Sequence, residues 1–106
     1  MSDFIPDKEA FQAASYAIDA IDLATAPYVP IESYRPTVGR ARDRLRVVCE
    51  EFDARGYAVT EEEVYLQLFD ALAFLTDALR VLPIEEKQLA RAKMSLSYVL
   101  HLAVTF

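Results

Sequence analysis

The chain has 106 residues, a hydrophobic fraction of 54%, and only 2 Gly and 5 Pro. This length suits one domain with a substantial core, and the low glycine content argues against a turn-rich β fold. The net charge is -6. Because such an acidic surface repels nucleic acid and anionic lipid, we expect no DNA or RNA partner and no membrane binding. We predict a single helical domain over residues 1–106.

Apolar residues spaced by three and four predict a first helix, with Asp7 as its cap. The predicted apolar stripe consists of Phe11, Ala14, Ile18 and Ile21. Pro27 and Pro30 then exclude a helix through the segment TAPYVPIESY. We expect this segment to cross the bundle in an extended form, with Tyr28 and Tyr34 as anchors.

A second helix is predicted between Pro36, which suits a first turn, and Gly56, which suits the residue after a helix. Its predicted core face consists of Val38, Ala41, Leu45, Val48 and Phe52. The single cysteine, Cys49, lies beside this face, so we interpret it as a small buried hydrophobe in a reduced compartment.

Alternate arginines occupy the middle of this helix. They are Arg40, Arg42, Arg44 and Arg46. Because alternate residues lie about 200° apart on a helix, they split into two i,i+4 pairs that flank the apolar face. Their stems could simply cover the edges of that face. Still, 6 of the 11 basic residues lie between Arg35 and Arg55, which makes this helix the candidate contact for an anionic ligand or an acidic partner.

A third helix has an explicit predicted start, because Thr60 and Glu63 match a capping box and Val59 and Val64 match a hydrophobic staple. Pro83 can open a fourth helix. The core face predicted for this fourth helix consists of Leu89, Ala92, Leu96, Val99, Leu100, Ala103 and Phe106. The fold class is therefore all-α, a four-helix bundle with an extended Pro-containing crossing between helices 1 and 2.

Both later helices carry candidate contact residues outside their predicted core faces, apolar on the third helix and mixed apolar and polar on the fourth. They are Phe74 and Val81 on the third helix, which we expect to be the most buried helix or to face a second subunit. They are Met94, Tyr98 and His101 on the fourth helix. These five residues are the candidate interface, unless they simply complete the core. We expect a homodimer or a larger oligomer, with Phe74 or Val81 at the contact.

The residues that usually carry chemistry are sparse. His101, the one histidine, has no acid three residues before it, as di-metal bundles require, so we expect no metal, no cofactor and no catalytic residue. The first residues, MSDFIPDKEA, lack the basic and apolar regions of a signal peptide, which predicts a cytoplasmic protein.

The sequence AIDAID, which contains Asp19 and Asp22, resembles the first helix of small all-helical chorismate mutases. That family has an arginine on this helix for the substrate carboxylate. Here Lys8 is the only basic residue of the first predicted helix, so we do not expect this enzyme activity.

Residues 68–94 resemble the helical hairpin of phage-encoded proteins that sequester cyclic nucleotide signals. In both, a proline separates an apolar helix from a helix with a Glu-x-x-Leu-Ala pattern, here Glu86, Leu89 and Ala90. The likeness covers about a quarter of the chain, and the first 60 residues show no counterpart, so we assign no family.

These features favour a binding module over an enzyme. We expect a small acidic antagonist that occupies or blocks a protein partner, similar in character to immunity proteins and phage anti-defence proteins. The alternative is a protein that binds or sequesters a small phosphate-bearing, nucleotide-like ligand through the arginines of the second helix.

Overall fold

Four α-helices account for most of the residues that the computed structural model describes, residues 5–104. The helices are α1 (Pro6–Ala24), α2 (Arg35–Arg55), α3 (Glu62–Leu79) and α4 (Glu86–Val104). Short 3-10 helices, η1 (Ile31–Tyr34) and η2 (Val59–Glu61), precede α2 and α3. The described residues contain no strand, which confirms the predicted all-α four-helix bundle.

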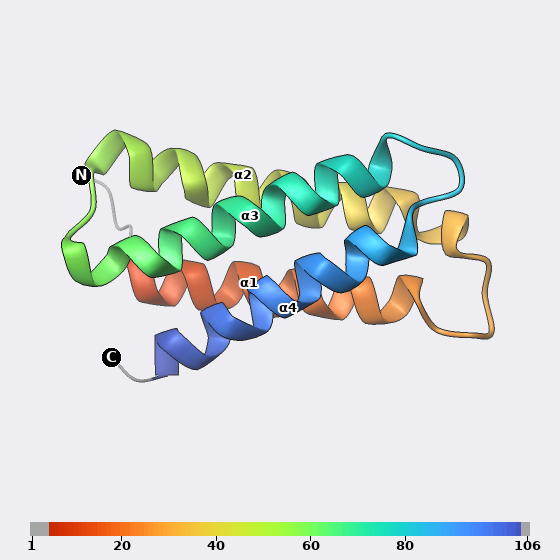
Figure 1. The fold of residues 1–106 in the computed structure, drawn as a ribbon, viewed down its shortest axis with the longest axis horizontal. Helices are drawn as coiled ribbons and strands as arrows, with labels where there is room; N and C mark the ends of the chain where they lie inside the picture. The colour runs from red at the N-terminus through yellow and green to blue at the C-terminus, as the bar shows by residue number, and fades with distance from the viewer. Residues whose placement is uncertain (1–4, 105–106) are drawn as a thin grey trace.

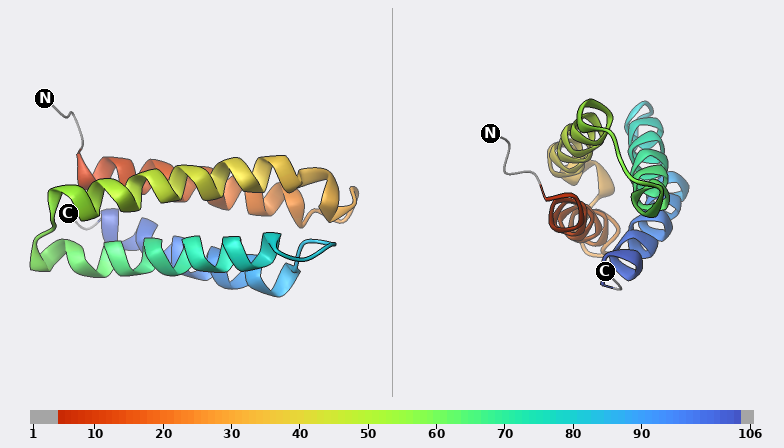
Figure 2. Two further views of the ribbon diagram at one scale, coloured as in Figure 1. Left: turned by 90° about the horizontal axis from the view of Figure 1, so that it is seen from above. Right: turned by 90° about the vertical axis from the view of Figure 1, so that its left-hand side faces the viewer.

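Consecutive helices are antiparallel neighbours, and α4 returns to pack against α1 (Figure 1). Seen end-on, the helices surround one common core (Figure 2). The connections 25–34 and 80–85 lie at the same end of the bundle, which we call the loop end. The 56–61 connection lies at the opposite end, together with the start of α1 and the last turn of α4.

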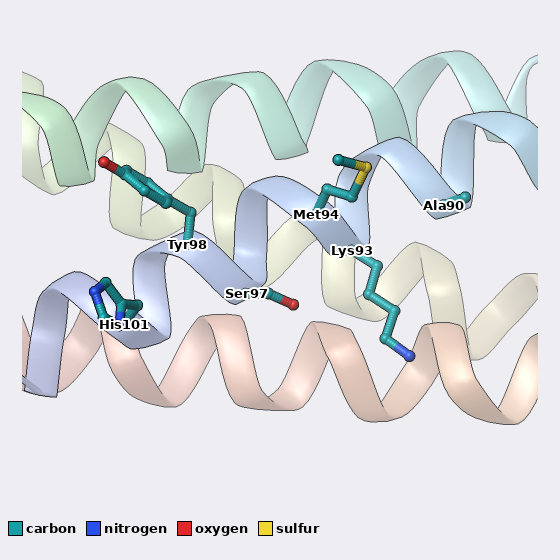
Figure 3. A pocket seen from close by; sticks show the side chains of 6 residues that line it. All are labelled: Ala90, Lys93, Met94, Ser97, Tyr98 and His101. Atoms are coloured by element: carbon teal, nitrogen blue, oxygen red, sulfur yellow. The ribbon is translucent and has the colours of Figure 1, made fainter.

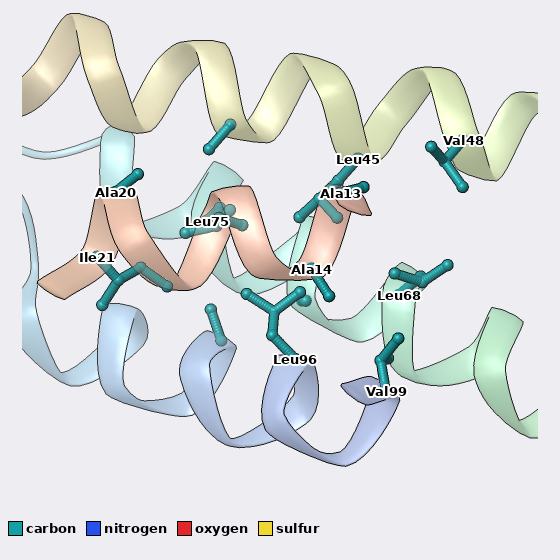
Figure 4. Close-up of a cluster of buried hydrophobic side chains, with 14 of the residues drawn as sticks. Ala13, Ala14, Ala20, Ile21, Leu45, Val48, Leu68, Leu75, Leu96 and Val99 are labelled. Carbon is teal, nitrogen blue, oxygen red and sulfur yellow. The ribbon is translucent and has the colours of Figure 1, made fainter. Parts of the chain in front are cut away.

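The α1 side of the core is built almost entirely of alanine. The buried residues of this helix are Ala10, Ala13, Ala14, Ala17, Ala20, Ile21 and Ala24. The predicted stripe is therefore wrong in part, because Phe11 is 40% exposed and Ile18 is only partly buried. Small side chains let neighbouring helices approach α1 closely. Larger side chains such as Leu45 of α2 and Leu96 of α4 pack into this space (Figure 4).

The core face predicted for α2 is confirmed. All five residues are buried: Val38, Ala41, Leu45, Val48 and Phe52. Cys49 is buried beside them, and burial, followed by the charges of Asp53 and Glu50, raises the pKa of its thiol to about 12. The thiol is therefore protonated at neutral pH, which agrees with its interpretation as a small hydrophobe.

The second hairpin of the bundle completes the core with one stripe from each helix. The buried residues are Val64, Leu68, Ala71, Leu75 and Ala78 on α3, and Leu89, Ala92, Leu96 and Val99 on α4. Leu100 is partly buried, whereas the Ala103 side chain and Phe106 lie outside the described residues. Helix α3 is not buried all round, because Leu66 and Phe69 are about half exposed.

The connection from α1 to α2 differs from its prediction. Residues 25–34 do not cross the bundle in an extended form, because a turn and η1 join two antiparallel neighbours at the loop end. Tyr28 is 91% exposed and anchors nothing in this chain, whereas Tyr34 packs against the core. The prolines do exclude an α-helix here, but a short loop is enough when the next helix lies alongside.

The predicted helix starts also need correction. Pro6 opens α1 and Ile5 precedes it, so Asp7 lies inside the first turn and does not cap the helix. The chain enters α3 through η2, where the Glu61 carboxylate accepts a hydrogen bond from the Ala58 N–H at 2.9 Å. The Thr60–Glu63 capping box does not form, because the Glu63 carboxylate accepts a hydrogen bond from Tyr98 instead. The Val59–Val64 staple does not form either, since Val59 is 87% exposed.

We predict opposite outcomes for the two overlapping cap candidates. Glu61→Ala should destabilise the protein by about 1 kcal/mol because the Ala58 N–H loses its acceptor. Thr60→Ala should change the free energy of unfolding by no more than about 0.5 kcal/mol. Urea unfolding followed by circular dichroism measures both, and a larger loss for Thr60→Ala would contradict this cap assignment.

The alanine face of α1 makes a second prediction. Ala17→Leu should destabilise the protein by about 1–3 kcal/mol, since Ala17 is 0% exposed and a larger side chain must displace a neighbouring helix. Ala73→Leu, on the exposed side of α3, is the matched control and should stay within about 0.5 kcal/mol. Thermal unfolding of both variants tests this, and equal melting temperatures would contradict close packing at α1.

Candidate functional site

The α2 arginines do not converge on one point. Arg42 and Arg46 both pair with Asp43, at 3.0 and 3.5 Å between nitrogen and oxygen. The Arg44 guanidinium lies 5.3 Å from the centre of the Tyr16 ring on α1, and among the described residues Arg40 donates to Thr37. A phosphate needs several positive groups directed at one position. Here Arg42 and Arg46 are directed at Asp43, which already neutralises part of their charge, whereas Arg40 and Arg44 are directed elsewhere.

Three of the predicted interface residues do come together, on the outer face of α4. Met94, Tyr98 and His101 line an open hollow of about 510 Å³ (Figure 3). The rest of its lining consists of Ala90, Lys93 and Ser97. Figure 3 shows Met94 and Tyr98 directed toward α3 and Lys93 directed toward α1, where it pairs with Asp22. Met94 is 74% exposed, so this face is open to a partner.

A second hollow lies along the start of α3. It has a volume of about 530 Å³ and is lined by Val59, Glu62, Glu63, Leu66, Gln67 and Asp70. The two hollows meet where the Tyr98 hydroxyl donates a hydrogen bond to the Glu63 carboxylate, at 3.0 Å. This bond raises the pKa of Tyr98 because ionisation would place two negative charges side by side.

The other two predicted interface residues lie elsewhere. Phe74 is partly buried and packs against the core, so it completes the bundle as the alternative interpretation allowed. Val81 lies beyond the end of α3, in the loop at the loop end, and is 46% exposed. Neither position therefore shares a face with Met94 and Tyr98.

A network centred on Arg35 joins the two connections of the loop end. The Arg35 guanidinium donates two hydrogen bonds to the Glu32 carboxylate, at 2.8 and 2.7 Å. It also donates to the backbone carbonyls of Leu79 and Val81, both at 2.6 Å. Glu32 in turn accepts the Ile84 N–H at 2.6 Å. Of these five charge-assisted hydrogen bonds, two join Arg35 to Glu32, and the other three tie this pair to Leu79, Val81 and Ile84, which fixes the 80–85 loop against the start of α2.

Large apolar side chains project from the loops that this network holds. Leu82 is 79% exposed and Tyr28 is 91% exposed. Single exposed apolar residues are common on protein surfaces, so it is their grouping at one end of the bundle that makes this region a candidate contact. Val29 and Val81 accompany them at 37% and 46%. We call these four residues the apolar tip. Beside it lies a hollow of about 330 Å³ lined by Ala24, Thr25, Ala26, Pro27, Val29, Ile31 and Glu86.

Among residues 5–104, no group of three or more His, Cys, Asp or Glu side chains could hold a metal ion. At the end of the bundle opposite the loop end, the Tyr65 hydroxyl donates a hydrogen bond to the Asp53 carboxylate at 2.7 Å, and this bond raises the pKa of Tyr65 to about 12. Its ring also stacks on Tyr57, with 4.7 Å between centroids, so it stabilises the α2–α3 junction.

Sequence reasoning predicted Val81 as an interface residue but missed Leu82, Val29 and the Arg35 network. Tyr28 was predicted to anchor the connecting segment, and Arg35 was counted only as one of a basic cluster. One available indication was that apolar residues stand next to prolines in both connections, at Tyr28 and at Leu82. Loops that carry exposed apolar residues on a rigid scaffold are frequent binding sites.

No protein-family model, no curated protein and no solved structure matches this chain. Within residues 5–104, none of the helices is long and apolar enough to cross a membrane. Function is therefore inferred below from surface geometry and charge.

The Arg35 network predicts a pH-dependent stability. Hydrogen bonds from Arg35, and then from the Ile84 N–H, lower the pKa of Glu32 below its ordinary value of 4.5. Because the folded-state pKa is the lower one, the ionised carboxylate stabilises the fold above pH 4.5, and this contribution is lost as the pH falls through the folded-state pKa. Glu32→Gln should therefore lower the melting temperature at pH 7, and the difference from the parent protein should shrink in acid.

Glu51→Gln, at an exposed position of α2, is the control and should follow the parent protein at both pH values. Differential scanning calorimetry measures the melting temperatures. A Glu32→Gln deficit that is equally large in acid would show that the carboxylate charge does not contribute.

Proposed function

We propose that this chain is a non-enzymatic binding module that occupies a protein partner through the apolar tip at the loop end. The observation that carries the proposal is the exposure of Leu82 on a loop that the Arg35 network fixes, with Tyr28 exposed on the other connection of the same end. Aromatic and large aliphatic anchors contribute most of the free energy of binding at many interfaces.

Rigid presentation supports this function. A loop that is ordered before binding loses less conformational entropy when the partner arrives, so more of the contact energy contributes to affinity. The bonds from Arg35 to the Leu79 and Val81 carbonyls hold the backbone on one side of Leu82, and the Ile84 N–H is held on the other. Leu82 is thus presented between two fixed points.

Charge favours a basic partner. The net charge of -6 attracts a positive surface at long range and speeds association at low salt. Glu86 lines the hollow beside the tip, and Glu85 precedes it in the chain, so acidic groups border the apolar contact. A small, acidic, rigid protein of this kind fits the role of an antagonist that blocks a functional surface, as immunity and phage anti-defence proteins do.

Binding of a phosphate-bearing small ligand by the α2 arginines is the alternative. It would require Arg40 and Arg44 to reorient and Arg42 and Arg46 to leave Asp43. The double substitution Arg42→Gln and Arg46→Gln separates the two functions, because it should leave partner affinity unchanged if the tip is the site.

A photo-crosslinking amino acid tests the location of the site. Placed at position 28 or at position 82 in cells that express the protein, it should capture the same partner. The same amino acid at Glu51, on the exposed side of α2, should not. Capture from position 51 alone, or of unrelated proteins from 28 and 82, would contradict the proposal.

Point variants then measure the contact with the purified partner. Leu82→Asp should weaken binding by about 2 kcal/mol, roughly 30-fold in the dissociation constant, because a charge replaces an anchor. Val59→Asp, which alters a residue that is 87% exposed at the opposite end, is the matched control and should bind normally. Calorimetric titration gives both values, and equal losses for the two variants would exclude the loop end as the site.

A further inference from the structure

The hollow on α4 has the residue spacing of a helix-binding surface. Its six lining residues form two successive sets spaced i, i+3, i+4 and i+7. The first set is Ala90, Lys93, Met94 and Ser97, and the second is Met94, Ser97, Tyr98 and His101. In coiled coils, a side chain from one helix inserts between four residues of this spacing on the facing helix. Small residues at positions 90 and 97 keep the surface hollow, so its shape fits a second helix laid along α4.

The exposed side of α4 also carries side chains that could insert into a hollow of this kind on a facing helix. The exposed residues of this stripe are Lys87, Arg91, Met94, Tyr98 and His101, spaced by four, three, four and three. This spacing is the one that keeps a row of residues facing a partner helix. Met94 stands at its centre and is 74% exposed. Helix α4 therefore carries a complete helix-pairing seam on the side opposite its core stripe.

Charge on this face is separated by sign. Lys87 and Arg91 lie near the start of α4, at the loop end, whereas Glu62 and Glu63 lie at the start of α3, at the opposite end. Neither glutamate forms an ion pair within residues 5–104. Residues 56–79 contain five acidic residues and no Lys, Arg or His. The α4 stripe is thus basic near the loop end and the start of α3 is acidic at the opposite end, with Met94 and Tyr98 between them.

We propose that this face pairs with the same face of a second copy of the chain, across a two-fold axis near the middle of α4. Met94 of each copy inserts among Met94, Ser97, Tyr98 and His101 of the other. A two-fold axis across the helices makes the two α4 helices antiparallel, so the basic end of each copy meets the acidic end of the other. Arg91 of each copy is carried toward Glu62 and Glu63 of the second copy.

This assembly goes beyond the proposed function and does not depend on it. The seam lies along the side of the bundle, whereas the apolar tip lies at its loop end. The two-fold axis directs the two loop ends in opposite directions, so the dimer presents two tips. Such a dimer can bind two partners, or two sites of one partner if their spacing matches.

Sedimentation equilibrium tests the dimer on the full chain. The expected result is a species of twice the 12.0 kDa chain mass. Met94→Glu should raise the dimer dissociation constant by about 30-fold or more, because it places a charge at the centre of the seam. Val47→Glu, at a position that is 57% exposed on α2, is the matched control and should leave the dimer intact. A monomer at every soluble concentration, or a dimer insensitive to Met94→Glu, overturns the proposal.

A charge exchange tests the orientation. The pair Lys87→Glu and Arg91→Glu should prevent self-association, and so should the pair Glu62→Lys and Glu63→Lys. An equimolar mixture of the two variants should recover a dimer, because each basic end then meets an acidic one. Circular dichroism confirms that each variant is folded. A mixture that remains monomeric while both folded variants are monomeric would overturn the antiparallel arrangement, and so would either variant that still forms dimers alone.

Discussion

The alanine face of α1 is the constraint on which the rest of the bundle depends. Six alanines on this helix are at most 2% exposed, so α2 and α4 can both lie close to it. The volume that α1 does not fill is taken by leucines and valines of the other helices, such as Leu45 and Leu96 (Figure 4). Larger residues on α1 would separate the two hairpins. Since α4 is placed by this contact, the direction of its exposed stripe follows from the same alanines.

The loop end adds a polar constraint to this apolar one. Helix packing fixes where the helices lie but leaves short loops free to fray. Arg35 prevents such fraying at the loop end. Its planar guanidinium donates hydrogen bonds to the Glu32 carboxylate of the first hairpin and to the Leu79 and Val81 carbonyls of the second. The same bonds use carbonyls near the end of α3 that would otherwise face solvent. In the proposed function, this network is what makes the loop around Leu82 rigid enough to act as a binding surface.

The sequence predicted faces well where charged residues border them, as on α2 and α4. The prediction of the buried face of α1 was wrong in part, because Phe11 and Ile18 are more hydrophobic than the alanines and dominate the sequence pattern. The alanines are buried instead because the neighbouring helices lie close to α1, which the sequence pattern does not show. Two overlapping i,i+3 pairs, Ala58–Glu61 and Thr60–Glu63, could each have capped the start of the third helix. The sequence could not decide between them without knowing where η2 begins. Met94, Tyr98 and His101 were predicted together because their site lies on one helix. Most of the tip was missed because it depends on Arg35 contacting carbonyls 44 and 46 residues away.

Helix α4 shows how one amphipathic element can serve two contacts. Its core stripe fills the space beside α1 and α3. Its outer stripe has the same alternation of spacings but carries Met94, Tyr98 and, near its start, Lys87 and Arg91 in place of leucines. A fully apolar outer stripe would pair in any register and with any exposed helix. Opposite charges at the two ends restrict pairing to one orientation, and the hydrogen bond from Tyr98 to Glu63 fixes one wall of the hollow before pairing. Because Arg35 and the tip make no use of this stripe, pairing along α4 leaves the loop end free.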